Sequence, residues 1–168
     1  MPTLARLVQL VYFMLPAYAA NMGPPFVRFW TGWNPPLSRR WLGSHKTTLG
    51  FGVGVLVAVV TAFIQARIGW SGAIATTLGW LDLGIRFGLG AMAGDAVKSF
   101  VKRRLGIEPG RPWIPFDQLD FALGALLLVG PSVGLDGPDI VVLLVVTFVG
   151  DLAVNRVGYA LGVRETPW

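Results

Sequence analysis

The sequence predicts an all-α integral membrane protein whose five helices cross the bilayer. Its 168 residues are 54% hydrophobic and only 14% charged, and the mean hydropathy is +0.61, which is too apolar for an ordinary soluble domain. Uncharged runs recur at about the 20 residues that a helix needs to cross a hydrocarbon layer. Most of the cations gather in two long connections between these runs, which is typical of cytoplasmic loops.

The chain is predicted to form a single transmembrane domain, residues 1–168. Its clearest span is 47–66, which has no charged residue between Lys46 and Arg67. The first span is interpreted as retained, because it lacks the charged start and small-residue cleavage site of a signal peptide. In the third span, Asp82 and Arg86 have the i, i+4 spacing of an ion pair on one helix face. Besides 47–66, the predicted spans are 4–22, 73–94, 117–135 and 139–159.

The cations predict an orientation in the cell membrane. Eleven of the 14 lie in the loops 23–46 and 95–116 or at the C-terminus, and the positive-inside rule therefore makes these segments cytoplasmic. This places the N-terminus outside and the C-terminus inside. The first loop has prolines that exclude a regular helix through 34–36 and tryptophans suited to the headgroup level. The eleven cations are Arg28, Arg39, Arg40, Lys46, Lys98, Lys102, Arg103, Arg104, Arg111, Arg156 and Arg164.

Two classes of chemistry are disfavoured by composition. Cysteine is absent, which excludes thiolate metal sites. His45 is the only histidine, so a Ser/His/Asp hydrolase would have one candidate base. The net charge of +5 suits nucleic acid, anionic lipid or nucleotide phosphates, but cations beside membrane spans favour the last two. No nucleic-acid partner is expected.

A carboxylate, a hydroxyl and two cations are predicted to share one helix face where the third span ends. If 95–104 is helical, Asp95, Ser99, Lys102 and Arg103 lie along one stripe through i+4, i+7 and i+8 spacing. A bare basic cluster would only set the topology and attract anionic headgroups. Carboxylates are not needed for either purpose, so their presence favours a functional site.

Two more carboxylates follow at the start of the fourth span. Asp117 and Asp120 are spaced i, i+3, so both can point to one side and converge with Asp95 at the inner edge of the membrane. Hard oxygen ligands without His or Cys favour Mg²⁺. Carboxylates for a metal beside cations for phosphate oxygens suit a Mg²⁺-polyphosphate.

The same stretch resembles a known family. SFVKRR, a Gly/Pro-rich spacer and then DQLDF are similar to the signature of membrane CTP-dependent cytidylyltransferases, and NPP followed by SRRWLGSHKTTLGF is similar to the lysine-threonine element of their archaeal branch. The resemblance covers both cytoplasmic loops and the number of spans. Within the spacer, EPGRPWIPF stands where relatives have a PGHGG-like segment, so no role is carried over there.

The resemblance implies transfer of CMP from CTP to a lipid phosphate with two isoprenoid chains, with release of pyrophosphate. An ionised phosphate nucleophile needs no general base, so catalysis reduces to positioning and charge neutralisation. The number of subunits is left open. The implied catalytic residues are Asp95, Lys102, Asp117 and Asp120, the Mg²⁺ ligands are Asp95, Asp117 and Asp120, and the nucleotide-binding residues are Lys46, Thr47, Ser99, Lys102 and Arg103.

Two other classes remain open from the sequence. A small transporter would explain Asp82, Arg86 and Asp151 within spans, but not the concentration of charges in one loop. A structural membrane subunit would need none of the aspartates for activity. Glycines of the second and third spans predict close helix packing, and a groove for the isoprenoid chains is expected between these spans. The similarity of 94–107 to 150–163 suggests a weak internal repeat.

Overall fold

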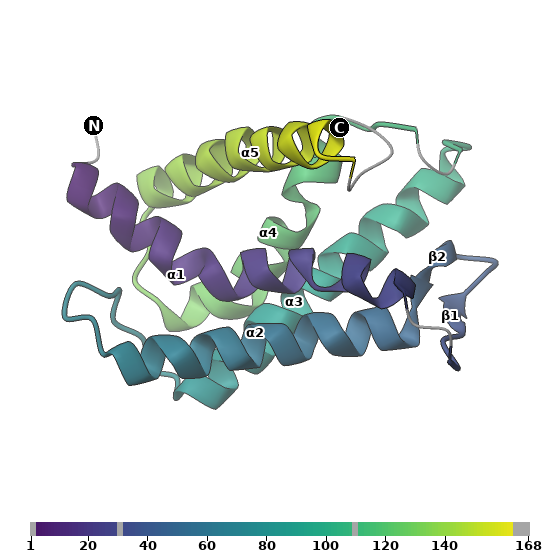
Figure 1. The fold of residues 1–168 in the computed structure, drawn as a ribbon. Helices are drawn as coiled ribbons and strands as arrows, with labels where there is room; N and C mark the ends of the chain where they lie inside the picture. The colour runs from purple at the N-terminus through teal and green to yellow at the C-terminus, as the bar shows by residue number, and fades with distance from the viewer. Residues whose placement is uncertain (1–2, 30–31, 109–110, 163–168) are drawn as a thin grey trace.

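The computed structural model describes residues 3–29, 32–108 and 111–162, and most of this part of the chain is helical (Figure 1). Trp30, expected as a headgroup anchor, and Arg164 lie outside the described residues, as do the side chains of Arg28 and His45. The long helices are α1 (Leu4–Met22), α2 (Thr48–Ile68), α3 (Trp80–Arg104), α4 (Phe116–Val129) and α5 (Gly137–Ala160). The shorter elements are η1 (Pro24–Phe29), β1 (Pro36–Ser38), β2 (Gly43–Thr47) and η2 (Gly130–Ser132).

Local signals fix the ends of the most regular helices. The Thr47 hydroxyl accepts a hydrogen bond from the Gly50 backbone N–H at 3.2 Å and so caps the start of α2. Gly69, in the left-handed conformation with φ +59°, ends the same helix. Asp136 caps α5 by accepting from the Asp139 N–H at 2.8 Å. These helices therefore begin and end close to the limits predicted for the second and fifth spans.

The third and fourth helices differ from the predicted spans. The helix α3 begins at Trp80 rather than at residue 73, because the preceding residues form turns; there the Thr76 hydroxyl accepts from the Leu78 N–H at 3.1 Å. The helix α4 ends at Val129 rather than at residue 135, since Gly130 and Pro131 lead into a 3-10 turn. At its other end α3 continues to Arg104, so 95–104 is helical as predicted.

A small β-hairpin in the first loop corrects the all-α prediction. Strands β1 and β2 pair antiparallel, with Pro36 opposite Thr47 and Ser38 opposite Gly43. Gly43 has φ +85° at the turn, a conformation that glycine adopts at no steric cost. The prolines exclude helix here, as predicted, but they are compatible with a short edge strand. The hairpin places Lys46 directly before the start of α2.

Glycines bring the central helices together as predicted. A Cβ on Gly84 would lie 2.7 Å from the Val59 Cα, and one on Gly88 would lie 2.7 Å from the Val55 Cα, so α3 contacts the backbone of α2. The same α3 packs most extensively on α4. The prediction of a groove for isoprenoid chains between the second and third spans is therefore wrong at this contact, because the backbones of α2 and α3 leave no space there.

The predicted ion pair between Asp82 and Arg86 is also wrong. Both side chains are exposed, and the Arg86 guanidinium donates to the Leu128 carbonyl oxygen at 3.4 Å. Among the described residues no salt bridge joins Arg86 to Asp82. The i, i+4 spacing permits such a pair, but the nearby carbonyl of α4 takes the guanidinium instead.

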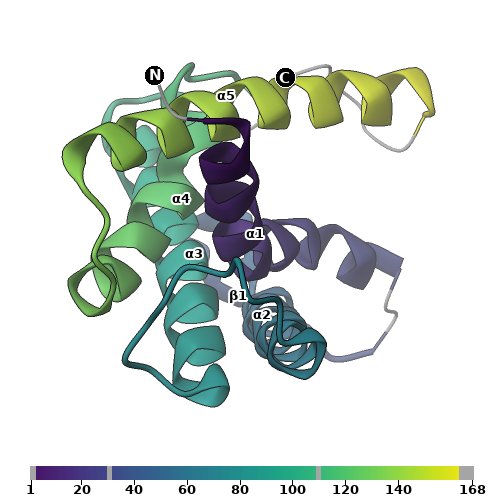
Figure 2. The ribbon, with the colours of Figure 1, turned by 90° about the vertical axis from the view of Figure 1, so that its left-hand side faces the viewer.

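The outer surface of the bundle is apolar. Among the described helices, α2 and α5 are long and apolar enough to cross a membrane, and only 22% and 17% of their apolar windows are buried within the protein. A core helix of a soluble protein would be mostly buried. The helices α2 and α5 lie on opposite sides of the bundle, with α1 and α4 between them (Figures 1 and 2). The hairpin and the C-terminal end of α3 share one end of the molecule, away from the loop that joins α2 to α3 (Figure 1).

Candidate active site

A partly buried ammonium group lies at the centre of the charged residues. The Lys98 Nζ is 3.1 Å from Asp95 Oδ1, 3.4 Å from Asp117 Oδ1 and 2.7 Å from Asp120 Oδ2. Asp95 comes from α3, whereas Asp117 and Asp120 come from the first turns of α4. The predicted convergence of three carboxylates from two segments is thus present, and it occurs around a cation of the chain itself.

Two further lysines complete the cluster from either side. Lys46, at the end of the hairpin, forms an ion pair with Asp95. Lys102, one helical turn after Lys98, places its Nζ 2.9 Å from both carboxylate oxygens of Asp117. The same Nζ donates to the Arg111 carbonyl oxygen at 2.7 Å. All three donors of this ammonium are therefore occupied, and they tie the end of α3 to the loop before α4.

Lys98 and Asp95, which follow the predicted limit of the third span at residue 94, hold each other in the charged state. Burial lowers the pKa of the Lys98 ammonium, but the three carboxylates around it outweigh burial and raise that pKa above its usual value. Burial raises the pKa of Asp95, yet Lys46 and Lys98 together bring it below its usual value. The pairs therefore persist as ions rather than neutralising by proton transfer.

The remaining predicted residues have other contacts. Thr47 caps α2 through its hydroxyl. The Ser99 hydroxyl donates to the Asp95 carbonyl oxygen at 2.9 Å within the helix. Arg103 lines a different pocket, with residues of the hairpin and the outer face of α3. The structure therefore brings Lys46 and Lys102 to the carboxylates, whereas it gives Thr47, Ser99 and Arg103 contacts elsewhere.

The aspartates suit a divalent cation by donor chemistry, since all three supply hard carboxylate oxygens. As they stand, no three His, Cys, Asp or Glu side chains of the described residues form a set that can hold a metal ion. The reason is visible in the contacts, because an ammonium already lies against each carboxylate. A metal ion can therefore bind at this cluster only if the carboxylates release their lysine partners.

Lys98 is the site residue that sequence reasoning missed. The positive-inside rule accounts for Lys98 as a cation that sets the topology, but this residue also stands i+3 from Asp95 and i−4 from Lys102. On a helix both spacings place side chains on one face. The pattern Asp-x-x-Lys-x-x-x-Lys, followed by the Asp-x-x-Asp of α4, was the available signal.

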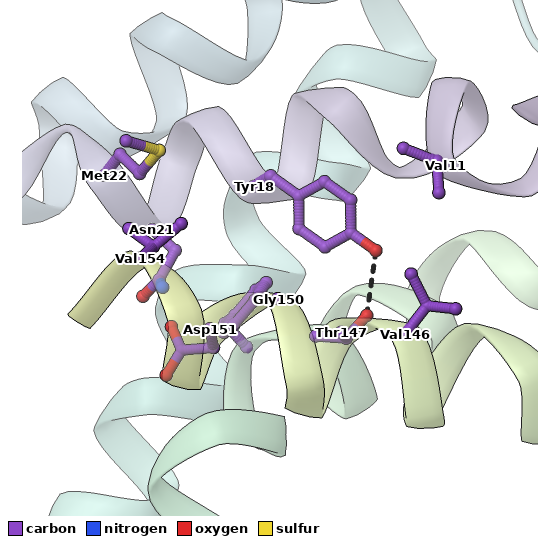
Figure 3. A pocket seen from close by; sticks show the side chains of 10 residues that line it. Val11, Tyr18, Asn21, Met22, Val146, Thr147, Gly150, Asp151 and Val154 are labelled. Carbon is purple, nitrogen blue, oxygen red and sulfur yellow. Dashed lines mark hydrogen bonds between the residues drawn. The ribbon is translucent and has the colours of Figure 1, made fainter. Parts of the chain in front are cut away.

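A mostly apolar cavity of about 250 Å³ lies between α1 and α5. It is bounded by α1, α5 and Phe121, the residue after Asp120. Tyr18 crosses it, with its hydroxyl 2.8 Å from Thr147 Oγ1 (Figure 3). The Tyr18 ring lies edge-on to that of Phe121. Gly150 and Asp151 of α5 lie on its wall, and Asp151 accepts a hydrogen bond from Asn155 at 2.9 Å. A space suited to hydrocarbon thus approaches the charged cluster.

The bundle has an apolar surface, and carboxylates and ammonium groups alternate at one of its ends. These features define a class of membrane protein whose site binds charged groups next to lipid. The profile of the CarS-like family, described as CDP-archaeol synthase, matches residues 3–168. The chain belongs to this family. The family assignment gives no support to the transporter alternative.

Individual relatives agree. The CDP-archaeol synthase of Methanosphaerula palustris is 39% identical over 172 residues, covering 92% of this chain and 100% of the relative. That of Methanopyrus kandleri is 39% identical over 169 residues, with 94% and 91% covered. A solved structure, described as an intramembrane enzyme for archaeal membrane lipids biosynthesis, superposes with a TM-score of 0.74 at 30% identity and covers 89% of this chain and 94% of its own. The chain is thus a membrane protein of an enzyme family.

Proposed function

We propose that this protein transfers CMP from CTP to an isoprenoid ether-lipid phosphate, unsaturated archaetidic acid, and forms CDP-archaeol and pyrophosphate for archaeal phospholipid synthesis. The observation that carries the proposal is the set of three wholly or partly buried carboxylates around the Lys98 ammonium, at the end of a bundle whose family is that of the CDP-archaeol synthases. Family membership supports the reaction, and the cluster supports its location.

The proposal includes a multi-pass orientation. Five helices would cross the membrane, with the N-terminus outside and the hairpin, the end of α3 and the C-terminus at the cytoplasmic face. The support is the apolar, largely unburied surface of α2 and α5 and the gathering of the predicted cytoplasmic cations at one end. The site would then face the cytoplasm, where CTP is available.

The reaction requires charge neutralisation more than proton transfer. An oxygen of the lipid phosphate attacks the α-phosphorus of CTP, the bond between the α- and β-phosphates breaks, and pyrophosphate leaves. A divalent cation, proposed as Mg²⁺ on Asp95, Asp117 and Asp120, would supply Lewis-acid stabilisation of the phosphate oxygens. Lys46, Lys98 and Lys102 would hold the negative charge of the triphosphate, because each can leave its carboxylate for a phosphate oxygen. Predicted nucleotide contacts by Thr47 and Ser99 remain part of the proposal, whereas Arg103, which lines a different pocket, is not assigned to the nucleotide.

The decisive assay uses the full-length protein in detergent. Incubation with labelled CTP, Mg²⁺ and archaetidic acid is expected to give equal amounts of labelled lipid and pyrophosphate, and a chelator is expected to stop both because the triphosphate charge is no longer neutralised. Addition of excess Mg²⁺ after the chelator should restore the reaction. Absence of both products across ether and ester lipid phosphates would remove the proposed function.

The cavity between α1 and α5 is proposed to hold one isoprenoid chain of the lipid substrate. Its wall is mostly apolar, and Phe121 links it to Asp120 through adjacent positions in α4. A chain lying there would place its phosphate toward the carboxylate cluster. Tyr18 and Thr147, joined across the cavity by a hydrogen bond, would limit how deep the chain enters.

Gly150→Leu tests the proposed chain site. A side chain at Gly150 meets nothing within 4 Å, so leucine would project into the cavity and displace about two methylene groups of the lipid, each worth about 0.8 kcal/mol. The KM for the lipid phosphate is expected to rise roughly tenfold, while the KM for CTP stays unchanged. The matched control is Gly52→Leu, since Gly52 of α2 also has open space around it. Equal KM values for Gly150→Leu and wild type would exclude the cavity as the chain site.

A further inference from the structure

A second pocket, of about 230 Å³, lies between the β-hairpin and the last turns of α3. The hairpin contributes Arg40 and Trp41, and α3 contributes Phe100, Arg103 and Arg104. Three guanidinium groups therefore surround one space, and none of the five lining residues is acidic. Like charges brought together in this way are stabilised by an anion.

Aromatic rings hold the guanidinium groups in place. The Arg104 Cζ lies 4.5 Å from the centre of the Trp41 ring, and the Arg40 Cζ lies 5.0 Å from the same centre, distances typical of cation–π contacts. The rings of Trp41 and Phe100 lie 5.7 Å apart. Arg103 has a buried Nε with no hydrogen-bond partner within the described part of the chain. The pocket is thus preorganised and retains an unused donor.

The second pocket lies on a different face of α3 from the active-site cluster. At 100° per residue, Arg104 is roughly 200° around the helix from Lys102, and Phe100 is roughly 200° from Lys98. Lys98 and Lys102 are already paired with Asp120 and Asp117. An anion in the second pocket therefore need not compete with substrates at the carboxylates.

We propose that the second pocket binds the phosphate of an anionic membrane lipid. A lipid is favoured over a free phosphate because the same face of α3 carries Val97, three residues before Phe100 and seven before Arg104, with 61% of its surface exposed. Leu37 of the hairpin is also exposed, at 43%. Charged donors next to exposed apolar side chains match the level of the headgroups. Lys46 lies on the same hairpin. A headgroup bound between the hairpin and α3 would therefore also restrict the position of Lys46 relative to α3.

The test compares lipid binding by the full-length protein in non-ionic detergent. Binding of phosphatidylglycerol and of uncharged diacylglycerol is counted by native mass spectrometry for wild type, for Arg40→Ala/Arg104→Ala and for the control Arg39→Ala. Arg39 is exposed on the same hairpin but outside the pocket. The double variant is expected to bind phosphatidylglycerol about tenfold more weakly, the scale of losing two solvent-exposed charge pairs. Diacylglycerol binding should not change, and Arg39→Ala should behave as wild type.

Competition by inorganic phosphate and by pyrophosphate distinguishes a lipid phosphate from a free phosphate as the occupant of the pocket. Neither is expected to displace phosphatidylglycerol at millimolar concentration. Displacement by either would overturn the lipid assignment, and equal phosphatidylglycerol binding by the double variant and wild type would overturn the site. A loss of CTP affinity with unchanged lipid binding would assign the pocket to the nucleotide and overturn the proposal too. If the double variant fails to fold, Arg40→Gln and Arg104→Gln singly carry the same comparison.

Discussion

Asp120→Asn is expected to lower the turnover of CTP roughly a thousandfold, the scale of losing a preorganised charge-stabilising group from an active site. The Asp120 side chain is buried, with Oδ2 2.7 Å from the Lys98 Nζ and Oδ1 accepting from the Phe121 N–H at 2.6 Å. Asparagine has the same shape but no charge, so it can neither bind a divalent cation well nor pair with the ammonium. Labelled-lipid formation with saturating CTP and lipid phosphate measures the loss.

Asp82→Asn provides the matched control for this substitution. Asp82 is an exposed carboxylate in the first turn of the same helix that carries Asp95 and Lys98, and its turnover is expected to equal that of wild type. Thermal unfolding of both variants in detergent separates catalysis from folding. Retention of more than a tenth of wild-type turnover by a folded Asp120→Asn protein would show that this carboxylate is not part of the reaction.

Gly124→Ala is expected to separate the two helices that build the site. A Cβ at Gly124 would collide with the Gly90 carbonyl oxygen and lie 2.9 Å from the Gly94 Cα. Backbone cannot rotate away as a side chain can, so α3 and α4 must move apart, at a cost of about 2 kcal/mol. The melting temperature should fall, and activity should be lost because Asp95 and Lys98 no longer meet Asp117 and Asp120.

Gly52→Ala is the corresponding control in α2. A Cβ there meets nothing within 4 Å, and alanine favours helix over glycine by about 1 kcal/mol. Its melting temperature is therefore expected to equal or exceed that of wild type. The interpretation of the helix contact fails if Gly124→Ala unfolds at the same temperature as Gly52→Ala and keeps its turnover.

Much of the site geometry follows from spacing along helices. The i, i+3 pair Asp117 and Asp120 and the stripe of Asp95 and Lys102 predicted convergence, and the structure shows it. Arg103 fits the same predicted stripe yet lines a different pocket. Its placement depends on where the hairpin puts Arg40 and Trp41, and no periodicity within α3 contains that information.

The differences in the fold have a similar origin. The start of α3 could not be predicted from hydropathy, because residues 73–79 are largely apolar, whereas the Thr76 hydroxyl and the Thr77 N–H both donate to the Ser132 carbonyl oxygen at 3.5 Å. The hairpin was hidden by the proline content of the first loop. For α3, a contact between distant segments decided the outcome over the local composition.

The three lysines and three aspartates of the cluster are equal in number and opposite in sign, so the group is formally neutral while no substrate is present. Because its net charge is zero, such a cluster can lie next to hydrocarbon without binding counterions. If the proposed function holds, an arriving phosphate would have to replace an aspartate as the partner of a lysine, and the aspartate released in that step would become free to accept a metal ion. Nucleotide and metal would then favour each other's binding, each supplying the partner that the other displaces.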